Sequence, residues 1–255
     1  DVEQRRALLA ELLKEKARQQ TLLAPASDGQ RALWFTQQSA PQSYAYHVSF
    51  SARVCSTVNV AHLQKAVQAV VNRHASLRTT YVLQDNQLMQ KVHPYQEAAF
   101  QQVDGSGWDD AQLHERVVRS DHQPFDLENG PVIRWSLFTR AEKDHIFLIT
   151  AHHIAIDAWS LWIVLEDLRQ GLQALANGEP IHLAAAPMPY TDWAKWQSEM
   201  LASPQGEELK TFWQQQLAGD LPLLNLPYDF PHPLIQSHHG DTVAFTTTPE
   251  QTHRL

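Results

Sequence analysis

The sequence predicts a mixed α/β (α+β) two-layer sandwich, in which helices pack against a sheet built partly from antiparallel hairpins. Two observations carry this prediction. Stretches with alternating apolar and polar residues are interspersed with stretches whose apolar residues recur every three to four positions, which indicates strands among helices. One continuous apolar run, Ile146–Ile149, is typical of a central strand covered on both faces.

Composition limits the kind of protein before any motif is considered. The 255 residues are 43% hydrophobic and 19% charged, as in globular proteins with a sizeable core. The net charge of −8 disfavours a nucleic-acid partner, because phosphate binding needs clustered cations. No apolar run approaches the ~18 residues of a membrane span. The single cysteine, Cys55, excludes an intramolecular disulfide and fits a cytoplasmic location.

The N-terminal region predicts a charged amphipathic helix. Residues 3–19 place four leucines at helical spacing among Arg, Glu, Lys and Gln side chains. Residues 1–21 could therefore be either a helix that caps the domain or a linker from a preceding module. A loop is expected at residues 21–29.

Strands and helices are then expected to alternate as far as residue 153. Period-two alternation marks the strands, and period-3.6 apolar spacing marks the helices. In chain order, the expected elements are a strand at 44–54, a helix at 60–73, a hairpin of strands at 77–83 and 87–95, a helix at 111–120, and strands at 132–140 and 145–153.

A strong helix is expected at residues 160–175, with Ser160 as its N-cap. The Pro-rich segment 181–189 predicts a linker, so residues 22–180 would form one lobe and residues 181–255 would begin a second. The pattern after the linker predicts helices at 190–201 and 207–219, one strand within 241–248, and a segment at 249–255 that could open a helix.

The candidate chemistry lies in residues 152–158, HHIAIDA. A histidine at the end of a central strand is held rigidly and can act as a general base toward an amine or alcohol. Asp157 is expected to fix the loop, most cheaply by pairing with an arginine. Rival interpretations are two purely structural histidines, a metal site and a Ser/His/Asp hydrolase. Adjacent strand histidines point to opposite faces, which disfavours a shared metal, and no GxSxG motif supports the hydrolase.

Four ordered blocks resemble the condensation domain of nonribosomal peptide synthetases, within the chloramphenicol-acetyltransferase-like superfamily. HHIAIDA is similar to that family's HHxxxDG, SDGQRALWFTQQ to S-x-A-Q-x-R-L-W-F, NRHASLRTTY to R-H-x-x-L-R-T-x-F, and YTDWAKWQ to Y-x-D-Y-A-x-W. GPVIRWSLF also resembles the strand before the hallmark. The resemblance covers the first half of the family's domain, which implies a chloramphenicol-acetyltransferase-like lobe followed by an incomplete second lobe.

The resemblance implies amide-bond formation between an acyl or peptidyl thioester and an acceptor amine. Phosphopantetheine arms of upstream and downstream carrier proteins would present both substrates, so no cofactor and no metal would be bound to this chain. His153 matches the catalytic histidine and His152 its supporting neighbour. Asp157 matches an aspartate that pairs with an arginine, for which Arg73 and Arg78 are the candidates here.

Ala158 departs from the family pattern, which has glycine at this place. Glycine permits a positive φ, whereas alanine keeps its N–H as a possible oxyanion donor if φ is negative. The alternatives therefore include an ester-forming variant with an alcohol acceptor and a catalytically silent platform that docks carrier proteins or tailoring enzymes. Without the second lobe the histidine would be open to solvent, so we expect the 255-residue chain alone to be poorly active. The isolated histidines, His47 among them, predict no chemistry.

Overall fold

The computed structural model describes residues 20–231, 234, 240, 243 and 245–254. The helix predicted over residues 3–19 therefore lies outside the described residues. The chain divides into two compact units, one ending at Ala218 and the other beginning at Gly219. Both sheets and the candidate site belong to the first unit. The lobe boundary at residue 181 stays a prediction.

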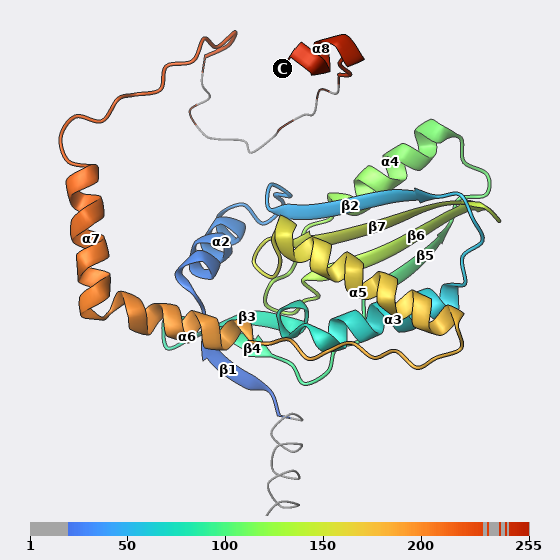
Figure 1. Cartoon of the computed structure of the whole chain (residues 1–255), viewed down its shortest axis with the longest axis horizontal. Coiled ribbons are helices and arrows are strands. Elements are labelled where there is room, and N and C mark those ends of the chain that lie inside the picture. The colour runs from blue at the N-terminus through green and yellow to red at the C-terminus, as the bar shows by residue number, and fades with distance from the viewer. Residues whose placement is uncertain (1–19, 232–233, 235–239, 241–242, 244, 255) are drawn as a thin grey trace, which may run out of the picture. The chain divides into compact units, whose positions relative to one another are not determined.

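Two sheets form the frame of the first unit (Figure 1). The smaller sheet has the order β1–β4–β3, with strands Leu22–Pro25, Gln87–Val92 and Thr79–Gln84. The larger sheet has the order β2–β7–β6–β5, with strands His47–Val54, Asp144–His152, Ile133–Ala141 and Phe100–Asp104. All neighbouring strands are antiparallel except β5 and β6, which are parallel.

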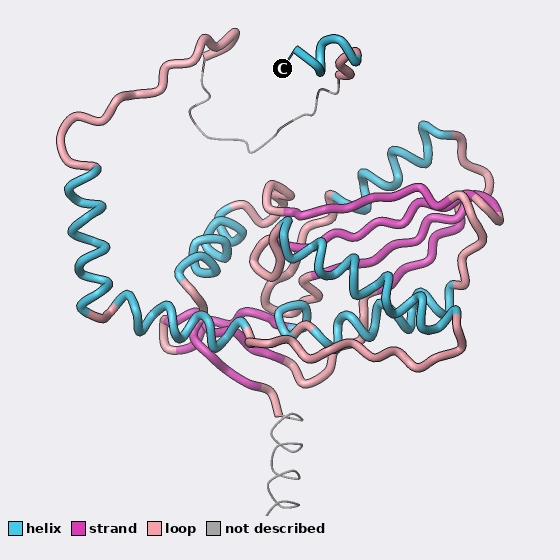
Figure 2. Tube along the Cα trace, viewed as in Figure 1, coloured by secondary structure: helices cyan, strands magenta, loops and turns pink. Residues whose placement is uncertain are grey.

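Two helices cover one face of the larger sheet, as Figures 1 and 2 show. They are α3 (Val60–Arg73) and α5 (Ala158–Ala176), which also contact each other. The other helices that the structure describes in the first unit are α2 (Asp28–Ser39), α4 (Asp110–Asp121), α6 (Tyr190–Leu201) and α7 (Pro204–Gln216), with a 3₁₀ turn η1 at Ala75–Arg78. In the second unit, α8 spans Pro249–Arg254, so the helix that could open near residue 249 is present.

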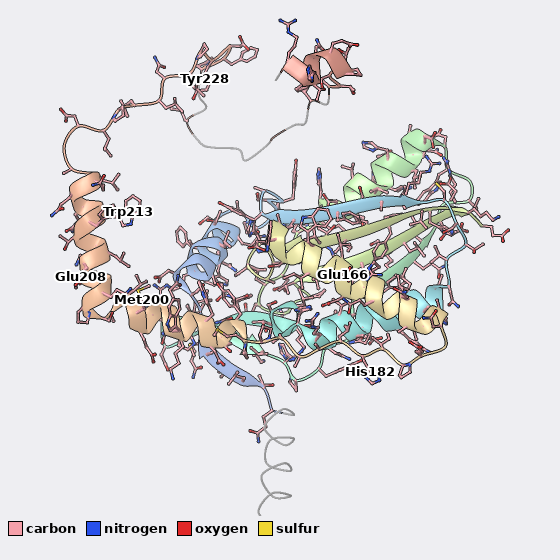
Figure 3. The ribbon with its side chains drawn as sticks, in the orientation of Figure 1. Glu166, His182, Met200, Glu208, Trp213 and Tyr228 are labelled. Atoms are coloured by element: carbon pink, nitrogen blue, oxygen red, sulfur yellow. The ribbon has the colours of Figure 1, made fainter. Side chains whose placement is uncertain are left out.

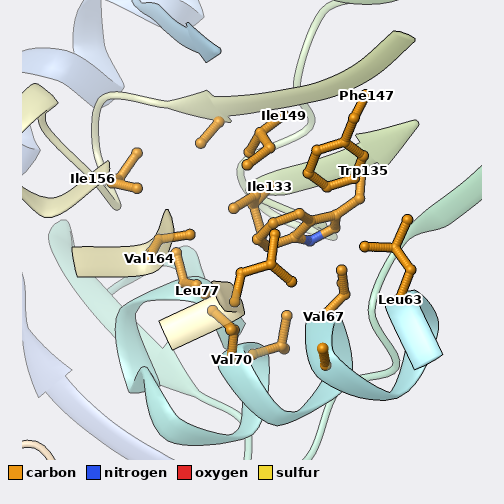
Figure 4. Packing of buried hydrophobic residues seen from close by; sticks show 14 of the residues in the cluster. Leu63, Val67, Val70, Leu77, Ile133, Trp135, Phe147, Ile149, Ile156 and Val164 are labelled. Atoms are coloured by element: carbon orange, nitrogen blue, oxygen red, sulfur yellow. The ribbon is translucent and has the colours of Figure 1, made fainter. Parts of the chain in front are cut away.

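Strand β7 is buried on both faces, which confirms the prediction made from its apolar run. Phe147 and Ile149 point into a core shared with α3 and α5, where they meet Trp135 of β6 (Figure 4). Leu148, one residue out of phase, packs on the opposite face against Leu113 of α4. Because successive side chains of a strand alternate between faces, packing on both faces of the sheet holds this strand in one register.

The helices α6 and α7 follow the predicted pattern but leave many large apolar side chains exposed. Trp196, Phe212 and Trp213 are all more than half exposed, and Figure 3 shows Trp213 projecting from α7. The main contact that α7 makes within the first unit is with α6. No apolar layer of described residues therefore covers these exposed side chains.

Several expectations differ from the structure. The loop expected at residues 21–29 contains the short strand β1, and β5 was not expected at all. Both are defined by hydrogen bonds to distant strands, β4 and β6, rather than by a local pattern. The strand expected within residues 241–248 is absent from the part of that segment that the structure describes.

Candidate functional site

The candidate loop joins the end of β7 to the start of α5 and comprises residues 153–157. Ile154 is buried in a core shared with the smaller sheet, and Ile156 is buried in the core under α3 and α5. His153 and Asp157 are exposed. The two isoleucines thus anchor the loop in separate cores, and this places His153 and Asp157 at the surface.

Backbone hydrogen bonds hold the loop on both sides of His153. The His153 N–H donates to the carbonyl of Tyr46 at 2.8 Å, just before β2. The Ala155 N–H donates back to the His152 carbonyl at 3.0 Å, closing a tight turn. From the opposite side, the Tyr81 hydroxyl donates to the Ile154 carbonyl at 3.1 Å. The backbone that carries His153 is therefore tied to two distant parts of the chain, at Tyr46 and Tyr81, and is closed by one hydrogen bond within its own turn.

His152 is fully buried and points away from the surface that His153 occupies. Its Nδ1 accepts a hydrogen bond from the Ile154 N–H at 3.1 Å. Burial, together with the nearby His47 and His153 rings, lowers the pKa of His152 to about 4. The ring is therefore neutral near pH 7 and carries its proton on Nε2. That nitrogen is buried without a hydrogen-bond partner among the described residues. His152 therefore has a structural role, since its ring holds the turn that carries His153.

His47 lies directly opposite His152 in the β2–β7 ladder, although its isolation in the sequence predicted no chemistry. Its Nδ1 donates to the Asp121 carbonyl at 2.8 Å, and its ring meets Phe125 edge-on. Burial lowers the pKa of His47 as well. No local pattern marks His47, because its place depends on the register in which the first residue of β2 pairs with the last residue of β7.

The expected ion pair between Asp157 and an arginine is wrong for the part of the chain that the structure describes. Asp157 is the N-cap of α5, and its Oδ1 accepts from the backbone N–H of Ser160 at 2.7 Å and from the Ser160 hydroxyl at 2.5 Å. These hydrogen bonds lower the pKa of the Asp157 carboxyl. The cap assigned to Ser160 therefore belongs to Asp157. An exposed carboxylate at a helix N-terminus needs no arginine, because backbone donors and the helix dipole stabilise it.

Both candidate arginines bind elsewhere. Arg73, at the end of α3, pairs with Asp167 of α5, and Arg78 donates to the backbone carbonyl of His93. His74 Nε2 lies 2.6 Å from the other carboxylate oxygen of Asp167. Asp167 is almost fully buried, so this cluster fixes the C-terminal end of α3 against the middle of α5. It stabilises the helix that follows the candidate loop rather than the loop itself.

Ala158 has an ordinary backbone conformation as the first residue of α5. The positive-φ residues other than glycine in the described chain are Asp85 and Asn86, in the turn between β3 and β4. Alanine therefore causes no strain at this position. Its N–H belongs to the first turn of a helix, where backbone donors have no intrahelical partner.

The candidate loop carries a group suited to proton transfer and leads into a helix N-terminus suited to anion stabilisation. An exposed imidazole, His153, precedes a helix N-terminus by five residues on a loop whose backbone is fixed. Helix N-termini favour developing negative charge. Among the described residues, no group of three or more His, Cys, Asp or Glu side chains is placed to hold a metal ion. No helix in the described part of the chain is long and apolar enough to span a membrane.

Comparison with known proteins adds independent information. A family model described as "Condensation domain" matches residues 20–255. A linear gramicidin synthase from Brevibacillus parabrevis is 34% identical over 231 residues, which are 89% of this chain and 3% of that protein. Phosphinothricin tripeptide synthetase PhsC from Streptomyces viridochromogenes is 31% identical over 237 residues, 91% of this chain and 22% of that protein. The chain thus spans a small part of these relatives.

Solved structures agree on the fold. The X-domain from teicoplanin biosynthesis, solved in complex with OxyB, matches with a TM-score of 0.75 at 27% identity, over 84% of this chain and 47% of that one. The first condensation domain of the calcium-dependent antibiotic synthetase, solved with a substrate analogue, matches with a TM-score of 0.69 over 79% of this chain and 50% of that one. The latter is 18% identical and shows the fold alone.

Proposed function

Because the chain belongs to the condensation-domain family, we propose that it joins an acyl or peptidyl thioester on one carrier protein to an acceptor amine on another. The phosphopantetheine arms of the two carriers present the substrates. The chain itself supplies protein groups and binds no cofactor of its own. The protein works in the cytoplasm, in keeping with its single cysteine.

The observation that carries the proposal is the exposed His153 on a loop with a fixed backbone. His153 accepts a proton from the acceptor amine, or holds that amine in place, as the amine attacks the thioester carbonyl. The carbonyl carbon forms a bond to nitrogen and its oxygen becomes an oxyanion. The oxyanion then re-forms the carbonyl as the carbon–sulfur bond breaks, and the departing thiolate of the carrier arm takes up the proton that the amine has lost. The N–H of Ala158, in the first turn of α5, is a candidate donor to that oxyanion. The neutral, buried His152 ring accepts a hydrogen bond from the Ile154 N–H and so stabilises the turn.

Two observations favour a second function, a catalytically silent docking platform. The teicoplanin X-domain, which was solved in complex with OxyB, is similar to this chain at 27% identity. Trp159 and Trp162 of α5 are strongly exposed beside the candidate loop, and they offer apolar surface to a partner protein. An ester-forming variant would use the same histidine with an alcohol acceptor. Offering both an amine and an alcohol acceptor separates that variant from the main proposal.

The test is single-turnover product formation by the protein as encoded, with both carriers loaded. We expect His153→Ala to lower the rate at least about 100-fold, the usual contribution of a positioned general base. The matched control is His114→Ala, which removes an exposed histidine on α4 and should leave the rate unchanged. Equal rates for wild type and His153→Ala would reject the catalytic role. No product from wild type, with retained binding of a partner enzyme, would favour the docking platform.

A further inference from the structure

A buried hydrogen-bond network lies behind the candidate loop and connects segments that are far apart in the sequence. The side-chain amide of Gln30, on α2, donates to the Tyr81 hydroxyl at 3.0 Å and to the Gln90 side-chain carbonyl at 3.1 Å. The Gln90 amide donates to the Pro25 carbonyl at 2.9 Å. Gln30, Tyr81 and Gln90 are all almost completely buried. Each of these contacts joins a different strand or helix, so the network fixes their relative positions.

The network continues to the start of α6. Gln30 forms a capping box with Ser27, in which each side chain accepts from the backbone N–H of the other residue. The Ser27 hydroxyl lies 2.9 Å from the Tyr190 hydroxyl. Three of the four sequence blocks singled out above therefore meet in one place. Ser27 and Gln30 belong to the block SDGQRALWFTQQ, Tyr81 to NRHASLRTTY, and Tyr190 to YTDWAKWQ.

At its other end the network reaches the candidate loop, which belongs to the remaining block. The Tyr81 hydroxyl donates to the carbonyl of Ile154, the residue directly after His153. Among the described residues, the Tyr81 hydroxyl is the one group that donates a hydrogen bond to the Ile154 carbonyl. Buried carbonyls without a donor are costly, so this contact fixes the peptide between Ile154 and Ala155. The hydroxyl has a defined direction because Gln30 donates to its oxygen and leaves the proton for Ile154.

We propose that Tyr81 is a positioning residue for His153, acting through the Ile154 carbonyl. This inference rests on the proposed function, because it assigns a role in setting the rate of that reaction. The Tyr81 ring fills the core, and its hydroxyl sets the angle of the turn that carries the imidazole. The resembled family block ends in phenylalanine at this position, so the core can hold a ring without the hydroxyl.

Burial supports the assignment of the hydroxyl as a donor. It raises the pKa of Tyr81 far above its usual value, so the phenol keeps its proton at neutral pH and well above it. The contribution of Tyr81 is therefore constant with pH. A change in the pH profile is not the signature of this role. The signatures are a change in the rate of the bound complex and in the mobility of the loop.

The experiment compares Tyr81→Phe with Tyr190→Phe in the protein as encoded. Both variants remove one hydroxyl from the same network, but only Tyr81→Phe removes the donor to Ile154. Three quantities are measured: the single-turnover rate with saturating loaded carriers, the carrier concentration for half-saturation, and hydrogen exchange of a peptide that covers residues 152–158. His153→Ala is measured in parallel.

We expect Tyr81→Phe to lower the saturated rate about tenfold, since small misplacement of a catalytic group is costly. The carrier concentration for half-saturation should not change, and hydrogen exchange in residues 152–158 should become faster. Tyr190→Phe should change neither the saturated rate nor the exchange. If Tyr81→Phe matches wild type while His153→Ala is inactive, the positioning role is wrong and the proposed function stands. If His153→Ala matches wild type, both are wrong. Equal losses from Tyr81→Phe and Tyr190→Phe would reduce the role of Tyr81 to general stability and overturn the inference.

A second variant covers the case in which Tyr81→Phe does not fold. Gln30→Met keeps both the Tyr81 ring and its hydroxyl but removes the donor that orients the hydroxyl, together with the Gln30 half of the capping box and the hydrogen bond to Gln90. We expect a smaller loss of the saturated rate, about threefold, with faster exchange over residues 152–158. An unchanged rate and unchanged exchange in this variant would overturn the inference.

Discussion

The loop at residues 153–157 and the helix α7 differ in how they are held. The loop has no regular secondary structure, yet two buried isoleucines and hydrogen bonds with two distant segments fix it. In contrast, α7 is a regular helix of 13 residues, and its large side chains Phe212 and Trp213 are more than half exposed. Regular backbone structure and fixed position are therefore separate properties in this chain. A site can be built on irregular backbone when its neighbours supply the hydrogen bonds and the core.

The largest expected effect concerns the helix that follows the loop. Asp167→Asn removes the carboxylate that Arg73 and His74 share between α3 and α5. A partly buried arginine that loses its partner should lower the free energy of unfolding by about 3 kcal/mol. Chemical denaturation measures this loss. Glu166→Gln is the control, since that neighbouring carboxylate pairs with Arg169 at the surface and should matter little. Similar losses in both variants would contradict a special role for the buried cluster.

A second effect, no larger than the first, is expected from pH, and it concerns the loop itself. The pKa of His152 is about 4 in the folded chain, below its usual value of 6.5, so the unfolded chain binds the proton more readily. Stability should therefore be full above about pH 6.5 and fall as the pH is lowered toward 4, by up to about 3 kcal/mol. His47 has a lowered pKa and adds in the same direction.

Denaturation of wild type and His152→Gln at several pH values between 7 and 4.5 checks the pH prediction. The variant should lose less stability than wild type over this range, because it lacks the titrating ring. The lowered pKa values of carboxyl groups such as Asp157 are common to both proteins and cancel in the comparison. Parallel curves for the two proteins would show that His152 is not the buried neutral ring that the structure describes.

The smallest expected effect concerns α7, and it tests the contrast between this exposed helix and the fixed loop. Trp213→Ala should change the free energy of unfolding by no more than about 0.5 kcal/mol, because the indole is 58% exposed. Trp135→Ala is the matched control. It removes the same side chain from a fully buried place and should cost about 4 kcal/mol. A large loss in Trp213→Ala would mean that α7 is packed against another surface, and the contrast drawn above would fail.

Local pattern predicted most of the elements around the site. The strand that becomes β7 and the helix α3 follow directly from apolar spacing, and the HHxxxD segment lies where the strand was expected to end. An arginine partner for Asp157 is expected because a carboxylate in a core needs one, but the structure leaves Asp157 exposed, where Ser160 and the helix N-terminus suffice. The apolar spacing that begins at Leu161 predicts Ser160 as the cap, whereas the exposed Trp159 lies in the helix without contributing to that spacing.

The missed features share a different cause. Strands β1 and β5, the opposition of His47 and His152, and the contact from Tyr81 to Ile154 all depend on pairing between distant segments. Strand pairing and buried hydrogen bonds of this kind leave no periodic trace in a single sequence. The Arg73–Asp167 pair is of the same type, since its partners are 94 residues apart. Composition and spacing identify such residues as candidates but do not choose among them.

The two buried isoleucines also explain why three unspecified positions separate His153 from Asp157. Ile154 and Ile156 enter different cores on either side of Ala155, so the segment acts as a molecular spacer of fixed length. An insertion or deletion here would drive one aliphatic side chain into solvent and turn His153 or Asp157 inward. A substitution at position 155 should therefore be tolerated better than a change in the number of residues between His153 and Asp157.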